Sequence, residues 1–287
     1  MGRKVPTRTS ERRTRLGGAA MRAFLQDQVA IVAGASRGIG AATADALSAG
    51  GAAVALAARS GPEIAAFAEE LAADGRRVLA VTSDVRDAAQ VDALVARTIG
   101  EFGSVDILVN VAGVIEPVGR CLWDIHPTEW ANSISTNLSG PFHTMAAVLP
   151  GMVERGYGRV INVSSEAAIY PLPGSAPYCA GKAGLDQLCR VAARETASTG
   201  VTVNAVDPGI IDTSLAHRWI TDMFGDASRW ILGRHRRHAN EAATLILWLC
   251  SPDTSDLTGA RVVWNDPWVV QQLNMFLGEL TDLDHVL

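Results

Sequence analysis

The stretch Val29-Ala-Ile-Val-Ala33 runs directly into Gly34-Ala-Ser-Arg-Gly38-Ile-Gly40, and these twelve residues decide the fold. The first five are continuously apolar rather than alternating, which is typical of a strand buried on both faces. A helical stretch over Ile39–Ala49 follows the glycines. A strand, a glycine-rich turn and a helix in this order indicate the start of a parallel α/β sheet.

The same alternation of strands and helices continues along the chain. We expect six further strands, at Ala53–Ala57, Val78–Val81, Ile107–Asn110, Val160–Val163, Val201–Val206 and Val262–Trp264. Helical segments lie between them, with Asp87 and Thr128 as helix caps. The prediction is an α/β, three-layer Rossmann fold, in which helices flank a doubly wound parallel sheet of about seven strands. Ligands of such sheets bind beyond the carboxyl ends of the strands.

Length and composition predict one large domain. The chain has 287 residues, of which 48% are hydrophobic and 19% charged. We assign residues 1–25 to a basic, disordered extension and 26–267 to a single domain with a substrate lid at about 210–240. Residues 268–287 form an apolar tail.

Charge argues against nucleic acid as the partner. The net charge of the chain is −5, and the first 25 residues have a net charge of +6, so the remaining residues have a net charge of −11. An acidic body of this kind does not favour binding to nucleic acid. The basic extension could also be an Arg-rich transit peptide, or precede a true start at Met21.

No run reaches the roughly 18 apolar residues of a membrane span, so we expect no membrane association. The extension also lacks the apolar core of a secretory signal, so the four cysteines are predicted to be reduced thiols in a cytoplasmic protein. The only close histidine pair, His235 and His238, lies among arginines and is interpreted as a solvated basic face. We predict no metal site.

The glycine turn has the composition of a phosphate cradle. Gly34, Gly38 and Gly40 allow a sharp turn and a close backbone approach, with Ser36, Arg37 and Ile39 between them. The helix that follows offers free N–H groups and a positive dipole end. The alternative is a purely structural turn.

The end of the second strand bears on which dinucleotide binds. It reads Ala57-Ala58-Arg59-Ser60, without the carboxylate that would bind ribose hydroxyls and repel a 2′-phosphate. Arg59 and Arg37 are placed to hold such a phosphate, which favours NADP(H) as cofactor, with NAD(H) possible. Alternatively, both are ordinary surface arginines.

Two further strand ends carry candidate cofactor contacts. Asp84 and Val85 follow the third strand, where a carboxylate can accept from an adenine amino group, although Asp84 could equally cap the next helix. Asn110-Val-Ala112-Gly113 follows the fourth strand, and its small residues permit close approach of the backbone to a cofactor.

Tyr178 and Lys182 form an i,i+4 pair on one helical face. A free tyrosine has a pKa of about 10 and is a slow base at neutral pH. We expect the Lys182 ammonium to lower the pKa of Tyr178, which would fit the phenol for general acid–base work. The alternative is a packed aromatic side chain beside a solvated lysine.

The ordered set of motifs resembles the short-chain dehydrogenases/reductases over about residues 26–266. The motifs are Gly34–Gly40, Asn110–Gly113, Asn137, Ser165, Tyr178-Cys-Ala-Gly-Lys182 and Asp207-Pro208-Gly209.

This resemblance implies a catalytic set of Asn137, Ser165, Tyr178 and Lys182. Ser165 would hold the substrate oxygen, with adjacent Ser164 as the alternative. Lys182 would also bind the nicotinamide ribose, and Asn137 a water that links Lys182 to bulk. Asn137 could instead be a helix-interior amide satisfied by backbone.

The resemblance also implies contacts to the nicotinamide from the segment after the sixth strand. They fall on Pro208, Gly209, Ile211 and Thr213, and Thr213 could equally cap a helix. Glu116, Trp123 and Glu166 are candidates to border the substrate pocket. Aromatic residues of the lid suggest an apolar or ring-bearing substrate. Arg234–Arg237 is interpreted as a solvated or interface face, and the alternative is that its arginines bind a carboxylate or phosphate of the substrate.

The chain departs from the family pattern in two places. Ala33 stands where a threonine is usual and Val111 where an asparagine is usual, so we expect slightly looser packing beneath the cofactor. Trp264-Asn-Asp-Pro267 replaces a common Val-Asp-Gly-Gly, and an apolar tail follows. Apolar surface of that extent is rarely left in water, so we expect a homo-oligomer, a tetramer or a dimer.

The expected function is an oxidoreductase, a carbonyl reductase or alcohol dehydrogenase that transfers a hydride between NADP(H) and a ketone or secondary alcohol. The expected partner is thus a small carbonyl or alcohol substrate. The alternatives are an NAD(H)-preferring dehydrogenase of the same fold and a non-catalytic protein that senses the cofactor.

Overall fold

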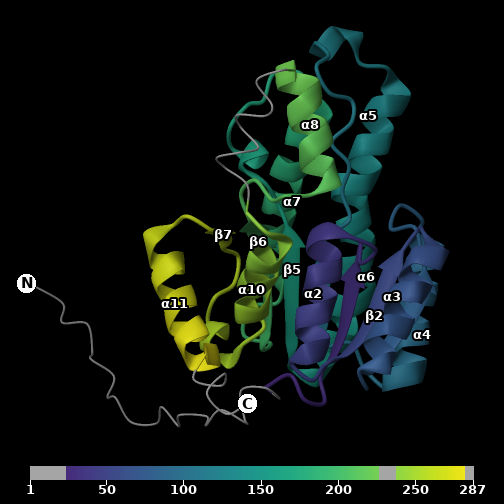
Figure 1. Ribbon diagram of the computed structural model, residues 1–287, viewed down its shortest axis with the longest axis vertical. Helices are drawn as coiled ribbons and strands as arrows, with labels where there is room; N and C mark the ends of the chain where they lie inside the picture. The colour runs from purple at the N-terminus through teal and green to yellow at the C-terminus, as the bar shows by residue number, and fades with distance from the viewer. Residues whose placement is uncertain (1–23, 226–236, 282–287) are drawn as a thin grey trace, which may run out of the picture.

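The computed structural model describes residues 24–225 and 237–281 (Figure 1). Seven strands form one parallel sheet in the order β3-β2-β1-β4-β5-β6-β7. The strands are β1 Val29–Ala33, β2 Ala53–Ala58, β3 Val78–Thr82, β4 Ile107–Asn110, β5 Gly158–Val163, β6 Val201–Asp207 and β7 Arg261–Val263. The chain thus has the predicted doubly wound fold, and the strand order reverses between β1 and β4.

Helices cover both faces of the sheet. They are α2 Gly38–Ala49, α3 Gly61–Ala73, α4 Ala88–Phe102, α5 Pro127–Ile134, α6 Gly140–Arg155, α7 Ala176–Glu195, α8 Ser214–Phe224, α10 Ala239–Leu249 and α11 Pro267–Thr281. Short turns are η1 Leu122–Asp124, η3 Glu166–Ala168, η5 Pro252–Thr254 and the π-helical turn η2 Ser135–Ser139. One core cluster packs α2, α3, α10 and α11 on the sheet, and a second packs α4, α6 and α7 on the other face.

Strand positions were predicted to within two residues, because strands buried on both faces have continuous apolar runs. The edge strand β3 departs from this pattern, since only Val81 in it is fully buried. Asp87 caps α4, as predicted, by accepting from the N–H groups of Ala89 and Gln90.

The predicted cap Thr128 was wrong. The cap of α5 is His126, whose ring accepts from the Thr128 N–H, while the Glu129 carboxylate accepts from the His126 N–H. Pro127 has no N–H to be satisfied and takes the first helical position, so the cap falls one residue before it.

Both ends of the described chain pack on the domain. Val269, Leu273 and Phe276 of α11 are buried in the core of their own chain. Phe24 packs edge-on against Phe276, with ring centroids 6.2 Å apart, and Leu25 is fully buried. The last two residues assigned to the basic extension therefore belong to the core, and its residues 1–23 lie outside the described residues.

No helix among the described residues is long and apolar enough to cross a membrane. The four cysteines are free thiols. Within the same residues, no group of three His, Cys, Asp or Glu side chains is placed to hold a metal ion.

Candidate active site

A cavity of about 780 Å³ opens at the carboxyl ends of the strands. The loop after β1, the ends of β2 to β5, the start of α7 and the segment after β6 all contribute to its wall. Seventeen of the twenty predicted site residues line it: Gly34, Ser36, Arg37, Gly38, Ile39, Arg59, Asp84, Val85, Ala112, Gly113, Ser165, Tyr178, Lys182, Pro208, Gly209, Ile211 and Thr213. Residues scattered over 180 positions therefore meet in one place.

The glycine turn has the geometry of an anion cradle. Gly34 has φ +99°, and a Cβ there would lie 2.6 Å from the Ala112 backbone nitrogen. A Cβ at Gly40 would lie 2.0 Å from the Gly34 carbonyl oxygen, so neither position accepts a side chain. Arg37 caps α2 without any side-chain hydrogen bond, which leaves the leading N–H groups of the helix available to a ligand. These features fit a cofactor pyrophosphate.

Gly40, Asn110 and Asn137 do not line the cavity, so the cofactor contacts predicted for Gly40 and Asn110 stay predictions without support from the cavity wall. Gly40 packs α2 against the Gly34 turn. Asn110 donates to Asn162 at 2.9 Å and accepts from Thr144 at 2.8 Å, which ties β4 to β5 and α6. Its side chain points into the layer behind the cavity wall.

Backbone bonds connect the first strand to the segment after β4. The N–H groups of Val111 and Ala112 donate to the Ala33 carbonyl at 2.9 and 2.8 Å. These two segments are thus joined through the main chain at Ala33, while the looser packing expected there stays a prediction.

The end of the cavity beside β2 and β3, where we expect the adenosine, is strongly charged. The exposed side chains of Arg37 and Arg59 line it. Asp84 is ion-paired with Arg86 at 2.5 Å, and hydrogen bonds from Arg86 hold the pKa of Asp84 below its ordinary value. Glu63, in the first turn of α3, also lines this end and was not predicted. Glu63 lies five residues past the end of β2, where the sequence gave no sign of a contact to the cavity.

Asn137 lies in the π-helical turn η2 behind Gly113. Its amide nitrogen donates to the carbonyls of Val114 at 2.7 Å and Ser133 at 3.0 Å, and its Oδ1 accepts from the Val114 N–H at 3.2 Å. A fourth hydrogen bond goes from the amide nitrogen to the Ser133 hydroxyl at 3.2 Å. Three of the four bonds are thus to backbone, as in the alternative of an amide satisfied by the main chain. One lone pair of Oδ1 is left for a further donor.

Tyr178 and Lys182 both lie on α7 and are buried. Nζ of Lys182 lies 5.7 Å from the centre of the Tyr178 ring and donates to the Val163 carbonyl at 2.7 Å. The expectation that Lys182 lowers the pKa of Tyr178 was wrong for this structure. Burial raises the pKa of Tyr178 to about 12, against a smaller lowering by a hydrogen bond with Ser165. Burial also lowers the pKa of Lys182 to about 8.

The structure distinguishes the two serines after β5. The Ser165 hydroxyl lines the cavity, accepts from the Ala167 N–H at 3.2 Å and hydrogen-bonds Tyr178. The Ser164 hydroxyl instead donates to Asp186 at 2.5 Å. Ser165 is therefore the hydroxyl that faces a reacting group beside Tyr178.

The wall near Tyr178 is apolar. Tyr178 packs in a small cluster with side chains that also line the cavity, namely Ile115, Leu172, Leu215 and Trp219. The first three were not predicted, because a single apolar residue, in a loop or in the first turn of α8, carries no sequence signal. Trp219 and Thr213 lie in the segment predicted to be a lid, and Thr213 both lines the cavity and caps α8 by accepting from the Ala216 N–H.

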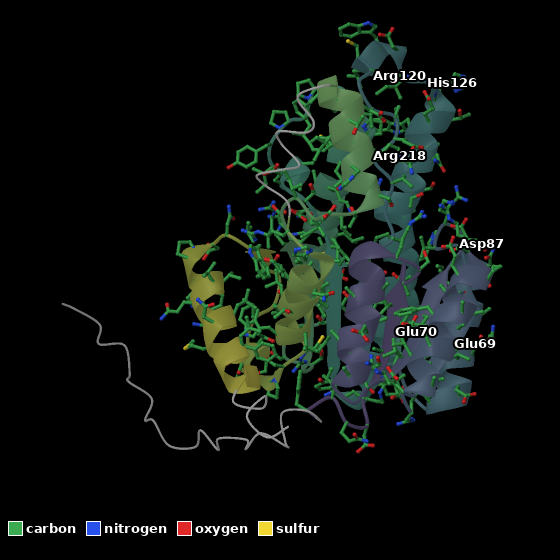
Figure 2. All side chains as sticks on the ribbon, viewed as in Figure 1. Glu69, Glu70, Asp87, Arg120, His126 and Arg218 are labelled. Atoms are coloured by element: carbon green, nitrogen blue, oxygen red, sulfur yellow. The ribbon has the colours of Figure 1, made fainter. Side chains whose placement is uncertain are left out.

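Two predicted borders of the pocket lie elsewhere. Trp123 is 83% exposed, and Glu116 pairs at 2.5 Å with Arg218 of α8, toward the end of the molecule that carries Arg120 and His126 (Figure 2). Glu166, as expected, lines the cavity. Arg237 stacks on the Trp264 ring at 4.8 Å, and the lid residues Trp230, Arg234 and Arg236 lie outside the described residues.

Known proteins resemble the chain over most of its length. The short chain dehydrogenase model matches residues 28–223. The 3-oxoacyl-[acyl-carrier-protein] reductase of Escherichia coli is 35% identical over 234 residues, which is 82% of this chain and 94% of that protein. The D-threitol dehydrogenase of Mycolicibacterium smegmatis is 33% identical and covers 86% of this chain and 95% of its own length.

Solved structures agree with these relatives. Levodione reductase superposes with a TM-score of 0.79 at 29% identity, over 85% of this chain and 98% of its own. A variant of actinorhodin polyketide ketoreductase with NADPH has a TM-score of 0.76 at 32% identity, over 82% and 95%. The chain has the fold, the glycine cradle and the Ser165, Tyr178 and Lys182 cluster on a shared cavity, and it belongs to the family of short-chain dehydrogenases/reductases, oxidoreductases that act on C=O and CH–OH groups.

Proposed function

We propose that the protein is a carbonyl reductase that uses NADP(H) to reduce an apolar ketone to a secondary alcohol, or runs the reverse reaction. The observation that carries this proposal is the meeting of Ser165, Tyr178 and Lys182 in the same cavity as the glycine cradle. One end of the cavity suits a dinucleotide and the other holds a hydroxyl, a phenol and an ammonium around one point.

The dinucleotide would be held by this chain's own backbone and small residues. The Gly34–Gly40 turn and the N-terminus of α2 fit the pyrophosphate, and Pro208, Gly209, Ile211 and Thr213 would form the wall for the nicotinamide. When bound, NADPH supplies the hydride.

The proton steps belong to the protein. Ser165 would donate a hydrogen bond to the carbonyl oxygen and orient it. Tyr178, with a pKa of about 12, holds its proton at neutral pH and would transfer it to the more basic alkoxide oxygen that forms. Lys182, with a pKa of about 8, is largely protonated at pH 7 and can return a proton toward the phenol. A water on the remaining lone pair of Asn137 would connect Lys182 to solvent.

Two arginines support NADP(H). Arg37 and Arg59 line the adenosine end, and neither is ion-paired among the described residues. The relative solved with NADPH supports the same choice. Glu63 favours the alternative, NAD(H), because a carboxylate at this end could accept from ribose hydroxyls. Arg59 lies at the end of β2, where the 2′-phosphate would be, and we give it the greater weight.

The apolar wall of Ile115, Leu172, Leu215 and Trp219 supports a substrate with little charge near its carbonyl. Three of the relatives are named as reductases of an oxoacyl group, of levodione and of a polyketide, whereas a fourth is named as a dehydrogenase of D-threitol. We also propose a substrate lid over about residues 210–240, of which α8 is one part.

The test is NADPH consumption by the full chain with aromatic ketones, α-diketones, sugars and acyl thioesters. We expect turnover of an apolar ketone, lost by at least about a thousandfold in Tyr178→Phe, because the proton donor is removed. Tyr170→Phe is the matched control, since this tyrosine is 63% exposed and lies outside the cavity. Equal turnover by Tyr178→Phe and Tyr170→Phe would refute the assignment.

We propose further that the protein is a homo-oligomer, a tetramer or a dimer. An apolar groove between α6 and α7 is lined by Leu138, Phe142, Leu188 and Val191. On α11, Trp268, Val270, Met275 and Leu277 are exposed although the rest of the helix packs on its own core. Such surfaces favour association. Light scattering during size-exclusion chromatography measures the mass, and a monomer of 30.3 kDa at micromolar concentration would contradict it.

A further inference from the structure

Four charged side chains lie together beneath the catalytic residues. Lys182 and Asp186 come from α7, Asp207 from the end of β6 and Arg261 from the start of β7. Lys182 is 4% exposed, Asp186 5% and Asp207 4%. The cluster has two positive and two negative charges, so it is neutral as a whole when every member is ionised.

Arg261 joins the two carboxylates. Its Nη2 donates to Asp207 Oδ2 at 2.6 Å, and its Nε lies 3.2 Å from Asp186 Oδ2. The Nε contact is an ion pair without hydrogen-bond alignment. Nη2 also donates to the backbone carbonyl of Ser165 at 3.1 Å. One guanidinium thus holds both carboxylates and the main chain of the catalytic serine.

Each carboxylate reaches a further part of the site. Asp186 accepts from the Ser164 hydroxyl at 2.5 Å and follows Lys182 by one helical turn. Asp207 accepts from the Gly209 N–H at 3.1 Å, in the segment proposed to face the nicotinamide. The cluster therefore connects the serine loop, the lysine helix and the cofactor wall.

We propose that Asp186, Arg261 and Asp207 are positioning residues, and that Asp186, kept ionised by Arg261, is the counter-charge that holds the proton on Lys182. The inference deepens the proposed function and rests on it for its catalytic meaning. The charge coupling to Lys182 can be measured without any substrate.

Other groups around Lys182 do not replace Asp186. The Cys189 thiol lies on the same helix, and burial raises its pKa to about 12, so it is neutral. Tyr178 is neutral for the same reason. From the packed elements, Asp207 is engaged by Arg261, Glu166 of η3 is exposed, and η2 presents the uncharged Asn137. The next charged residue along α7, Arg190, is exposed. The charged residue of α5, Glu129, forms an ion pair with Arg120.

Arg261 affects Lys182 indirectly, because it helps to keep the buried Asp186 carboxylate ionised. Burial raises the pKa of Asp186, and the Ser164 hydroxyl and Arg261 counter that rise. If Arg261 is removed, Asp186 should take up a proton, and Lys182 should lose its counter-charge as if Asp186 itself were neutral. Asp186→Asn and Arg261→Met should therefore have the same effect, and the double variant should add nothing.

The sequence offers a direct measurement. Lys4 and Lys182 are the chain's two lysines, so protein labelled with ¹³Cε-lysine gives two resonances, and Lys182→Met assigns them. We expect Lys182 of the wild type to titrate near pH 8. In Asp186→Asn and in Arg261→Met the midpoint should fall by about one pH unit, a tenfold change in protonation.

Asp106→Asn is the matched control. Asp106 is a partly buried carboxylate that pairs with Arg155 at 3.6 Å and accepts from the Val29 N–H at 3.0 Å, at the amino ends of the strands. It should lose stability while the Lys182 midpoint stays in place. An unchanged midpoint in Asp186→Asn would overturn the proposal. Because Arg261→Met could disturb β7, Arg261→Lys is measured as well and should restore the midpoint in part.

The pH dependence of kcat tests whether this charge coupling matters for catalysis. In NADPH-linked ketone reduction, the alkaline limb of kcat should move down by the same unit in Asp186→Asn, with the acid side little changed. A uniform fall in kcat without movement of the limb would assign Asp186 a structural role and overturn the proposal. If the wild type reduces no ketone, the proposed function fails, whereas the resonance of Lys182 still decides the charge coupling.

Discussion

Replacing Lys182 with methionine should abolish activity and stabilise the fold. The Lys182 ammonium is 4% exposed, and burial lowers its pKa from 10.5 to about 8. At pH 7 this difference means that holding the charge inside costs about 3 kcal/mol of folding free energy. Methionine has a similar length and no charge, but it leaves the Val163 carbonyl without its donor, which costs about 1–2 kcal/mol. We therefore expect a net gain of about 1–2 kcal/mol.

The dependence on pH separates this cause from better packing. A group whose pKa is lowered by folding carries its full cost below the folded pKa, and the cost disappears as pH rises toward the unfolded pKa. The stability difference between Lys182→Met and wild type should thus be largest below pH 8 and should shrink toward zero as the pH rises from 8 to 10.5.

Urea unfolding at pH 7 and at pH 10 measures this difference, with a thermal scan as a second probe. At pH 7 we expect a rise in Tm of about 2–8 °C for a domain of this size. A variant that is less stable than wild type at pH 7, or a difference that stays the same at both pH values, would refute the reasoning.

Two other substitutions test the cofactor end. Arg59→Asp should weaken NADPH binding by about 10- to 100-fold through loss of a charge-assisted contact and change NADH binding by less than about threefold, measured by fluorescence titration. Equal effects on both nucleotides would contradict the phosphate role. Gly34→Ala should cost about 3 kcal/mol in urea unfolding, because φ is +99° and its Cβ would meet the Ala112 nitrogen. Gly75→Ala, with φ +79° and nothing within 4 Å, should cost only about 1 kcal/mol, and similar losses would count against the steric argument.

Features that depend on neighbours in the chain were predicted from sequence. The strand Ile107–Asn110 and the cap Asp87 follow from local apolar runs and short-range hydrogen bonds. The gathering of Ser165, Tyr178 and Lys182 follows from family resemblance and from the rule that parallel strands end at one edge. His126 was missed as a cap because a ring nitrogen can take the place of the usual hydroxyl or carboxylate.

Features that depend on three-dimensional burial were not predicted. The spacing of Tyr178 and Lys182 suggests a lowered phenol pKa, but the depth of the site dominates and raises it. The apolar tail suggested surface for a partner, whereas Val269, Leu273 and Phe276 are covered by their own chain. Sequence gives the composition of a segment, and only the packing shows which of its faces is already occupied.

The buried cluster illustrates the same limit at the active site. Asp186, Asp207 and Arg261 come from three elements, and each is an ordinary charged residue in its own stretch of sequence. Only the fold places one guanidinium within 3.2 Å of both carboxylates. A single buried cation such as Lys182 would tend to lose its proton, whereas a neutral group of four lets it stay charged near pH 7. The same compensation limits change at Asp186, Asp207 or Arg261, since neutralising one of these three leaves an unpaired charge beneath Ser165. In the proposed reductase, this compensation would let Lys182 hold a proton next to the Tyr178 phenol despite the cost of burying four charges.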